Sequence, residues 1–225
     1  MASQPVIGIL SGLDQKSAAP FIDAFIKEYE KPFLTKGEVE IPEMRVYALR
    51  VTCIDKVPED AEETKKELMR ACQQLEKDGA TCIVLTSYIA HQYIDELRSA
   101  VRIPLLDMVT LAMECIKKAP YKVALLGTRV TIATHIFQTA LAGKKSEGVM
   151  PPYWQTHVDA MFKKIKVGLS AQTEFNWLLG RIKSSGITTV IVASTDLSKM
   201  ASRATGFTMI DTNLLLAEAA VRLCR

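Results

Sequence analysis

The sequence predicts an α/β protein built from two similar halves, each with a parallel sheet and flanking helices. Short apolar runs rich in β-branched residues alternate with amphipathic helical patterns, as in sheets whose strands are buried on both faces. This succession occurs twice. In each copy one apolar strand leads into a serine, Ser87 after residues 82–85 and Ser194 after residues 190–193. Open α/β sheets bind ligands at the ends of their strands, so the two serines are the first candidates for a functional site.

The first half begins with an apolar strand that breaks at Ser11-Gly12. The next strand alternates in polarity, and the helix after it repeats apolar residues at helical spacing until Gly79 stops it. The strand before Ser87 follows, and then a helical pattern, another short strand and another helix. We expect strands at residues 6–10, 45–51, 82–85 and 103–107, and helices at residues 16–29, 61–78, 89–101 and 109–118.

The second half restarts this order at Lys122, with an apolar strand that ends at Gly127-Thr128. A helix, a loop and two further helical patterns precede the strand that leads into Ser194. The closing helix is strongly apolar and is expected to pack against the body of the protein. We expect strands at residues 122–128, 189–194 and 207–211, helices at residues 131–142, 158–167, 173–184 and 213–223, and a loop at residues 143–152.

Three positions of the first half have a counterpart in the second half, in the same order along the chain. This order predicts a two-fold internal repeat, with the two halves facing each other across a cleft. We expect domains at residues 1–105 and 106–212, with residues 213–225 as a C-terminal helix that packs back on the body. The counterparts are Val6 and Val123, Ser87 and Ser194, and Asp107 and Asp211, at separations of 117, 107 and 104 residues.

Composition places the chain among ordinary globular proteins. Its 225 residues are 48% hydrophobic and 24% charged, which is enough for a sizeable core. The net charge of +3 is too small to indicate a nucleic-acid partner, and no apolar run reaches the ~18 residues of a membrane helix. Because the N-terminus lacks the basic region of a signal peptide, we expect a cytoplasmic protein. The five cysteines and three histidines show neither a disulfide framework nor metal-ligand spacing.

Five short motifs lie near predicted strand ends, in order along nearly the whole chain. They are Gly8-Ile9-Leu10-Ser11-Gly12, Thr86-Ser87-Tyr88-Ile89-Ala90-His91, Leu126-Gly127-Thr128-Arg129-Val130-Thr131, Ala193-Ser194-Thr195-Asp196-Leu197 and Asp211-Thr212. No single motif is specific, but the five in this order resemble the aspartate/glutamate racemase family, whose members work without pyridoxal phosphate. The resemblance implies two pseudo-symmetric α/β domains with the site between them, no cofactor, a small amino-acid or carboxylate ligand, and a homodimer.

The sequence departs from the family pattern at the positions that carry the family's chemistry. Family racemases have Pro-Cys-Asn-Thr-Ala-His and Gly-Cys-Thr-Glu-Leu, and the two cysteines act as paired acid and base on the α-carbon. Ser87 and Ser194 stand at those positions. Tyr88 and Ile89 replace the asparagine and the threonine, and Asp14-Gln15 stands in place of a Gly-Pro pair.

A serine hydroxyl is a much weaker acid than a thiol. Free cysteine has a pKa of ~8.5, and a general base works best with a pKa near the working pH. A hydroxyl acts only with an adjacent base. We therefore predict that racemisation of aspartate or glutamate through Ser87 and Ser194 is very slow or absent. Because the phenol of Tyr88 occupies an asparagine-sized position, we also expect a differently shaped pocket, whose ligand need not be aspartate or glutamate.

Another group could take over the missing proton transfer. His91 has a suitable unperturbed pKa, and the alternative is that it caps or hydrogen-bonds within the start of its helix. Asp14 and Asp196 border the predicted cleft, where either could orient His91 or bind a substrate ammonium group. A Ser-His-Asp arrangement would suggest acyl transfer, but no Gly-x-Ser-x-Gly turn surrounds either serine.

The binding apparatus matches the family better than the chemistry does. Hydroxyls and free backbone N–H groups at strand ends and helix starts suit a carboxylate. Each residue alone is more readily a helix cap, but their convergence under the repeat favours a shared anion site. Asp107 and Asp211 fit helix-starting caps better than catalysts. The candidate ligand-binding residues are Ser11, Tyr88, Thr128, Thr131, Thr195 and Asp196.

Three interpretations follow. The chain is a binding or regulatory relative that keeps a small-acid cleft and has lost the racemase pair. Alternatively, it is a working isomerase or lyase on a small carboxylate, with His91, an aspartate or a water as base. In the third, the serines replace native cysteines by experiment, which the further changes at Tyr88 and Ile89 argue against.

Overall fold

The computed structural model describes residues 5–12, 18–33, 40–49, 61–116 and 122–225, and the chain divides into two compact units. Unit 1 comprises Met1–Met108 and Asn213–Arg225, and unit 2 comprises Val109–Thr212. Each unit contains a four-stranded sheet in which every strand pairing is parallel. The predicted α/β class with two parallel sheets is confirmed. The chain leaves unit 1 after Met108 and returns to it after Thr212.

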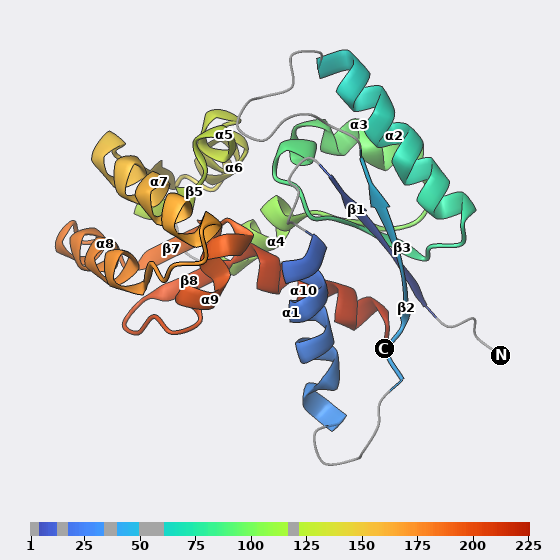
Figure 1. Cartoon of the computed structure of the whole chain (residues 1–225). Coiled ribbons are helices and arrows are strands. Elements are labelled where there is room, and N and C mark those ends of the chain that lie inside the picture. Colours follow the sequence, from blue (N-terminus) through green and yellow to red (C-terminus); the bar gives the residue numbers. More distant parts are fainter. Residues whose placement is uncertain (1–4, 13–17, 34–39, 50–60, 117–121) are drawn as a thin grey trace. The chain divides into compact units, whose positions relative to one another are not determined.

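Unit 1 is organised around a sheet with the strand order β2-β1-β3-β4 (Figure 1). Its strands are β1 (Val6–Ser11), β2 (Glu43–Ala48), β3 (Cys82–Leu85) and β4 (Leu105–Leu106). The central strand β3 is buried throughout, whereas the edge strand β2 exposes Val46 and Tyr47. The helical segments are α1 (Ala18–Glu30), η1 (Lys31–Phe33), α2 (Ala61–Lys77), η2 (Ile89–Tyr93), α3 (Ile94–Ala100) and α10 (Thr212–Leu223).

Helices cover both faces of this sheet, with α2 and α3 on one side of the strands and α1 and α10 on the other (Figure 1). Side chains alternate along a strand, so Leu85 points to the face of α2 and α3, where it shares an apolar cluster with Leu68 and Leu97. The other face receives Phe21 and Phe25 of α1, both fully buried. Burial on both faces explains why these strands read as continuous apolar runs.

The C-terminal helix α10 is fastened to α1 at both of its ends. Near its start, Asn213 Nδ2 donates a hydrogen bond to the carbonyl oxygen of Pro20 at 3.2 Å. At the end of the chain, Arg225 donates to the carbonyl oxygen of Tyr29 at 3.1 Å. The Arg225 guanidinium also lies 5.6 Å from the ring centroid of Tyr29 and 5.9 Å from that of Phe33, within cation–π range. The last residues are therefore part of unit 1.

Unit 2 repeats the architecture with the strand order β6-β5-β7-β8. The apolar side chains of α7 and α8 pack on one face of this sheet, around Trp154 and Phe175. The strands are β5 (Lys122–Gly127), β6 (Glu147–Val149), β7 (Thr189–Ala193) and β8 (Thr208–Asp211). The helical segments are α4 (Met108–Cys115, which begins at the unit boundary), α5 (Arg129–Ala133), α6 (Ile136–Gly143), α7 (Pro152–Lys166), α8 (Gln172–Ser184), η3 (Thr195–Leu197) and α9 (Ser198–Ala201).

The strand registers allow residues of the two units to be matched. In unit 1 Ile83 pairs with Leu105, and in unit 2 Val190 pairs with Met209. Four residues after the first member of each pair stand Ser87 and Ser194, and two residues after the second member stand Asp107 and Asp211. The registers are thus compatible with matching the two serines and, at the same time, the two aspartates. With the serines matched, the pairings of β1 with β3 and of β5 with β7 make Val6 equivalent to Lys122, one residue before the expected Val123.

Several observed elements differ from the predicted ones, among them the following. The expected loop 143–152 contains the short strand β6, whose Gly148 and length of three residues give no strand pattern. The expected helix 131–142 is two helices, since His135 adopts a left-handed φ of 56° between them. The expected helix 89–101 begins as the tighter η2. Helix α7 begins at Pro152, where a proline is favoured because the first helical N–H needs no partner.

Candidate functional site

The first predicted set of site residues lies where β1 and β3 end side by side in unit 1. Leu10 pairs with Leu85, and both the backbone N–H and the hydroxyl of Thr86 donate to the Leu10 carbonyl oxygen, at 3.2 and 3.1 Å. Ser11 is the last residue of β1 and Ser87 comes two residues after β3; they are 5% and 4% exposed. Residues 86–91, which we call the unit 1 serine turn, run from the strand into η2. Tyr88, which is also buried, and His91 belong to the same turn.

His91 connects this turn to the start of helix α4. Its Nδ1 lies 2.8 Å from the Ser87 carbonyl oxygen, and the backbone N–H of Met108 donates to its Nε2 at 3.2 Å. Since a carbonyl accepts and an N–H donates, Nδ1 carries the proton and the ring is neutral. Met108 supplies one of the first-turn N–H groups of α4 that have no partner within the helix. The imidazole therefore caps α4 from the serine turn.

Charged groups near His91 come from two neighbouring elements. Asp107 Oδ1 lies 3.6 Å from Nε2, and Asp107 Oδ2 accepts a hydrogen bond from Arg98 of α3 at 3.2 Å. Burial of the ring lowers the pKa of His91 from its ordinary 6.5; Asp107 and the Ser87 carbonyl counteract this, and Arg98 adds to it. The ring stays neutral at physiological pH, as its hydrogen bonds require.

The lowered pKa makes stability pH-dependent. Below pH 6.5 the unfolded chain protonates His91 and the folded chain does so only at lower pH. The free energy of unfolding should therefore fall as the pH drops, by up to about 1.4 kcal/mol per pH unit from this group. Denaturant melts of the wild type and of His91→Gln at pH 5–7 measure the free energy of unfolding. We expect this free energy to change less steeply with pH in the variant. Parallel slopes would show that His91 does not titrate differently in the two states.

The second predicted set lies at the ends of β5 and β7 in unit 2. Thr128 caps the five-residue helix α5: its hydroxyl accepts from the Thr131 backbone N–H at 3.1 Å and lies 2.9 Å from the Thr131 hydroxyl. Gly127 pairs with Ala193, so Thr128 and Ser194 follow neighbouring strands. The structure thus brings Thr128, Thr131 and Ser194 to the same edge of the unit 2 sheet. The contact between Thr128 and Thr131 is a helix cap, which is the alternative role that we expected for these residues from the sequence.

A polar network that the sequence did not predict supports the Thr128 turn from helix α7. The side-chain amide of Gln155, 5% exposed, donates to the Gly127 carbonyl oxygen at 3.2 Å and to Asp159 Oδ1 at 2.8 Å. The other oxygen of Asp159 accepts from Arg129 Nε at 2.5 Å. Gln155 and Asp159 are one helical turn apart on α7, and nothing in their local pattern indicates a contact with β5.

Residues 194–198, which we call the unit 2 serine turn, lead from β7 through η3. Ser194 is 5% exposed and its carbonyl oxygen accepts from the Leu197 backbone N–H at 3.2 Å, while Thr195 and Asp196 are half-buried. The turn closes with Ser198, whose hydroxyl donates to Asp211 Oδ1 at 3.0 Å. The sequence did not single out Ser198. It stands four residues after Ser194, as His91 stands four residues after Ser87.

None of the cysteines that the structure describes belongs to a serine turn. Burial raises the pKa of the Cys72 and Cys82 thiols to about 12, so both are protonated at neutral pH. Cys82 begins β3 and therefore lies at the opposite end of that strand from Ser87. Cys115 ends α4 and Cys224 follows α10. Cys53, Asp14 and Gln15 lie outside the described residues.

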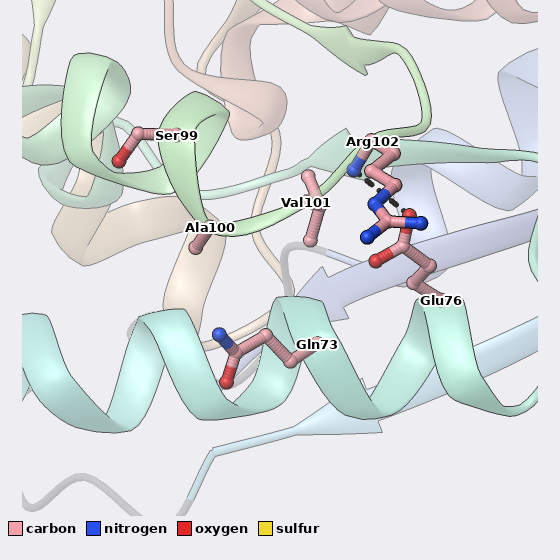
Figure 2. Close-up of a pocket in the computed structure, with 6 residues that line it drawn as sticks. All are labelled: Gln73, Glu76, Ser99, Ala100, Val101 and Arg102. Carbon is pink, nitrogen blue, oxygen red and sulfur yellow. Dashed lines mark hydrogen bonds between the residues drawn. The ribbon is translucent and has the colours of Figure 1, made fainter.

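A surface hollow of unit 1 is distinct from the serine turn. Figure 2 shows it between helix α2 and the segment that leads from α3 toward β4. The carboxylate of Glu76 accepts a hydrogen bond from the Arg102 backbone N–H at 2.8 Å and so holds this segment on α2. Arg102 precedes β4, so the hollow lies toward the amino ends of the strands. It is lined by Gln73, Glu76, Ser99, Ala100, Val101 and Arg102.

Within the described ranges, no three His, Cys, Asp or Glu side chains are grouped so that they could hold a metal ion. Over the same ranges, no helix has the length and apolar character needed to span a membrane.

Comparisons with known proteins agree with this architecture. A family model described as Asp/Glu/Hydantoin racemase matches residues 40–220. The chain is 32% identical over 222 residues to the broad specificity amino-acid racemase RacX of Bacillus subtilis (strain 168), covering 96% of each protein. An aspartate racemase homologue from Pyrococcus horikoshii OT3 is similar in structure, with a TM-score of 0.80, 23% identity, and coverage of 97% of this chain and 98% of that one. Glutamate racemase from Francisella tularensis, solved with D-glutamate, has a TM-score of 0.61 at 13% identity, over 98% and 81% of the two chains.

Proposed function

Since the chain belongs to the Asp/Glu/hydantoin racemase family, we propose that it binds a small amino acid or another small carboxylate at its serine turns and inverts it slowly or not at all. The observation that supports this proposal is that Ser87 and Ser194 follow the central strands β3 and β7, in two sheets whose registers are compatible with matching the two serines. These are the positions that we assign to the family's paired cysteines. The proposal that the chain binds a ligand thus rests on the fold. The proposal that it inverts the ligand slowly or not at all rests on the side chains of Ser87 and Ser194.

The ligand-binding groups that we propose are hydroxyls and backbone N–H groups at the strand ends. Ser11 and Tyr88 contribute from unit 1, and Thr128, Thr131, Thr195 and Asp196 from unit 2, with Asp196 suited to a ligand ammonium group. Support for an amino-acid ligand comes from the D-glutamate bound to the Francisella enzyme and from the broad specificity named for RacX. Because Tyr88 is buried within the unit 1 serine turn, we expect the ligand range to extend beyond aspartate and glutamate.

Slow inversion follows from the chemistry of serine. Inversion at an α-carbon needs a base on one side and an acid on the other, each with a pKa near the working pH. Serine hydroxyls meet this only with an adjacent base. His91 does not supply that base in the observed geometry, because its contact with Ser87 is to the carbonyl oxygen and its Nε2 accepts from Met108. The same contacts speak against a Ser-His-Asp acyl-transfer site. An isomerase or lyase that uses His91 is therefore the weaker candidate.

The decisive experiment follows the ligand's α-proton by NMR in deuterated water, with each enantiomer of aspartate and glutamate and a panel of neutral amino acids. We expect at least one ligand to raise the melting temperature while its α-proton signal persists for days. The size of the rise gives the affinity, because a ligand that binds only the folded state stabilises it by RT ln(1 + [L]/Kd). Rapid loss of the α-proton signal would overturn the inactivity, and no effect of any ligand would overturn the binding role.

A further inference from the structure

In each unit, side-chain hydrogen bonds connect the serine turn to the residues where the chain passes to the other unit. We call this set of hydrogen bonds the tie of that unit. In unit 1 His91 bridges the Ser87 carbonyl oxygen, at 2.8 Å, and the Met108 backbone N–H, at 3.2 Å. In unit 2 the Ser198 hydroxyl donates to Asp211 Oδ1 at 3.0 Å. His91 and Ser198 each stand four residues after the serine of their turn, and with the serines matched the strand pairings match Asp107 with Asp211. The tie is thus present in both copies of the repeat, with different side chains.

Each tie ends at the last residues of its own unit. Met108 is the residue at which the chain leaves unit 1, and Thr212, next to Asp211, is the residue at which it leaves unit 2. The Thr212 hydroxyl also donates to the carbonyl oxygen of Val192, inside β7, at 2.9 Å. In both units, therefore, the serine turn and the exit of the chain are joined by side-chain hydrogen bonds. Closeness in sequence does not produce this contact, since His91 and Met108 are 17 positions apart.

We propose that His91 and Ser198 are positioning residues, which lock each serine turn to its exit residue so that the two move as one body. This role rests on the proposed function, because it serves the ligand contacts of the serine turns. His91 is buried, with its side chain 1% exposed, and both of its ring nitrogens are engaged in hydrogen bonds. A buried donor or acceptor that loses its partner is destabilising, so the turn cannot shift without a compensating rearrangement.

The test compares Ser198→Ala, which removes the donor to Asp211, with Ser198→Thr, which keeps a hydroxyl. Ser184→Ala is the matched control, because it removes an exposed hydroxyl on α8 that bonds only within its helix. In unit 1, His91→Asn keeps a donor near the Ser87 carbonyl and His91→Gln keeps a group near Met108. Probe binding is measured with L-aspartate and D-glutamate by calorimetry, and amide hydrogen exchange is followed by mass spectrometry without any probe.

We expect Ser198→Ala to bind the better probe about tenfold more weakly, the scale of a modest misplacement, and Ser198→Thr and Ser184→Ala to bind it as the wild type does. Both His91 variants should weaken binding, since each breaks one end of the tie. Without probe, Ser198→Ala should raise amide exchange in both segments 194–198 and 208–213. If a His91 variant does not fold, the comparison of Ser198→Ala, Ser198→Thr and Ser184→Ala still tests the positioning role.

Each other outcome is informative. Wild-type affinity in Ser198→Ala, or faster exchange in only one of the two segments, overturns the positioning role while the proposed function stands. If neither probe binds the wild type, the calorimetry is repeated with the neutral amino acids of the panel; binding of none of them overturns the proposed function and the positioning role with it, and the exchange data then show whether the hydrogen bond between Ser198 and Asp211 links the two segments. A loss in Ser198→Thr equal to that in Ser198→Ala would show that the site responds to packing and not to the hydrogen bond.

Discussion

The double variant Ser87→Cys, Ser194→Cys should exchange the α-proton of a bound amino acid about 10²–10⁴ times faster than the wild type, the usual contribution of general acid–base catalysis. The substitution replaces an oxygen by a sulfur at two equivalent, buried positions and changes little else. A thiol with a free pKa of ~8.5 yields a usable thiolate near neutral pH, which a hydroxyl does not. Proton NMR in deuterated water measures the exchange of the α-proton. The decay of the circular dichroism signal of a pure enantiomer measures racemisation.

The single variants separate the two roles. Ser87→Cys and Ser194→Cys should each exchange the α-proton of one enantiomer with retention, whereas inversion should require both thiols. Ser87→Ala with Ser194→Ala is the inert control, since it has neither thiol nor hydroxyl. A double cysteine variant as inert as this control would show that more than the two sulfurs is missing. Adding Tyr88→Asn would then test whether the phenol in the unit 1 serine turn has remodelled the site.

The substitution Gly12→Ala should be among the most damaging in the chain. Gly12 follows Ser11 at the end of β1 and adopts a φ of +112°, where L side chains are strained. An added Cβ would also lie 2.3 Å from the backbone nitrogen and 2.4 Å from the carbonyl oxygen of Leu49, which cannot move as a flexible side chain can. Strain and overpacking of this kind cost about 2–4 kcal/mol, or roughly 5–15 °C in Tm for a chain of this size.

Gly180→Ala is the matched control for this prediction. Gly180 lies inside helix α8, is exposed, and has no atom within 4 Å of an added Cβ. Alanine favours the helix over glycine by up to about 1 kcal/mol, so this variant should melt at the same temperature as the wild type or slightly higher. Thermal melts of the two variants side by side isolate the backbone effect. An unchanged Tm for Gly12→Ala would mean that the segment around Leu49 adapts to the methyl group.

The parts of the fold that the sequence predicts are those whose pattern is local. Buried strands such as β3 read as apolar runs, and helix α2 shows its apolar stripe at helical spacing, because each is recorded in consecutive residues. Strand β6 has no such record: its residues become a strand by pairing with β5. The sequence does not predict the break between α5 and α6 for a related reason. The residue with the left-handed backbone there is His135, and only a glycine would have indicated such a conformation.

The candidate site divides in the same way. Ser87 and Ser194 could be found because each follows an apolar strand, and the registers are compatible with matching them. Ser198 and Gln155 could not, since their partners, Asp211 and the Gly127 carbonyl, are distant in sequence. His91 was recognised, but only its hydrogen bonds show that it caps α4. Polar contacts between residues distant in sequence form only once the fold has brought them together. A local sequence pattern therefore does not predict them.

The return of helix α10 to unit 1 has a consequence for how the chain folds during synthesis. Unit 2 is one continuous segment, Val109–Thr212, whereas unit 1 needs Asn213–Arg225, including the Asn213 and Arg225 contacts with α1. Domains fold as units while the ribosome elongates the chain. All residues of unit 2 are therefore available before helix α10, which unit 1 requires, has been synthesised. We therefore expect unit 2 to fold before unit 1, although unit 1 begins earlier in the chain, and helix α10 to complete unit 1.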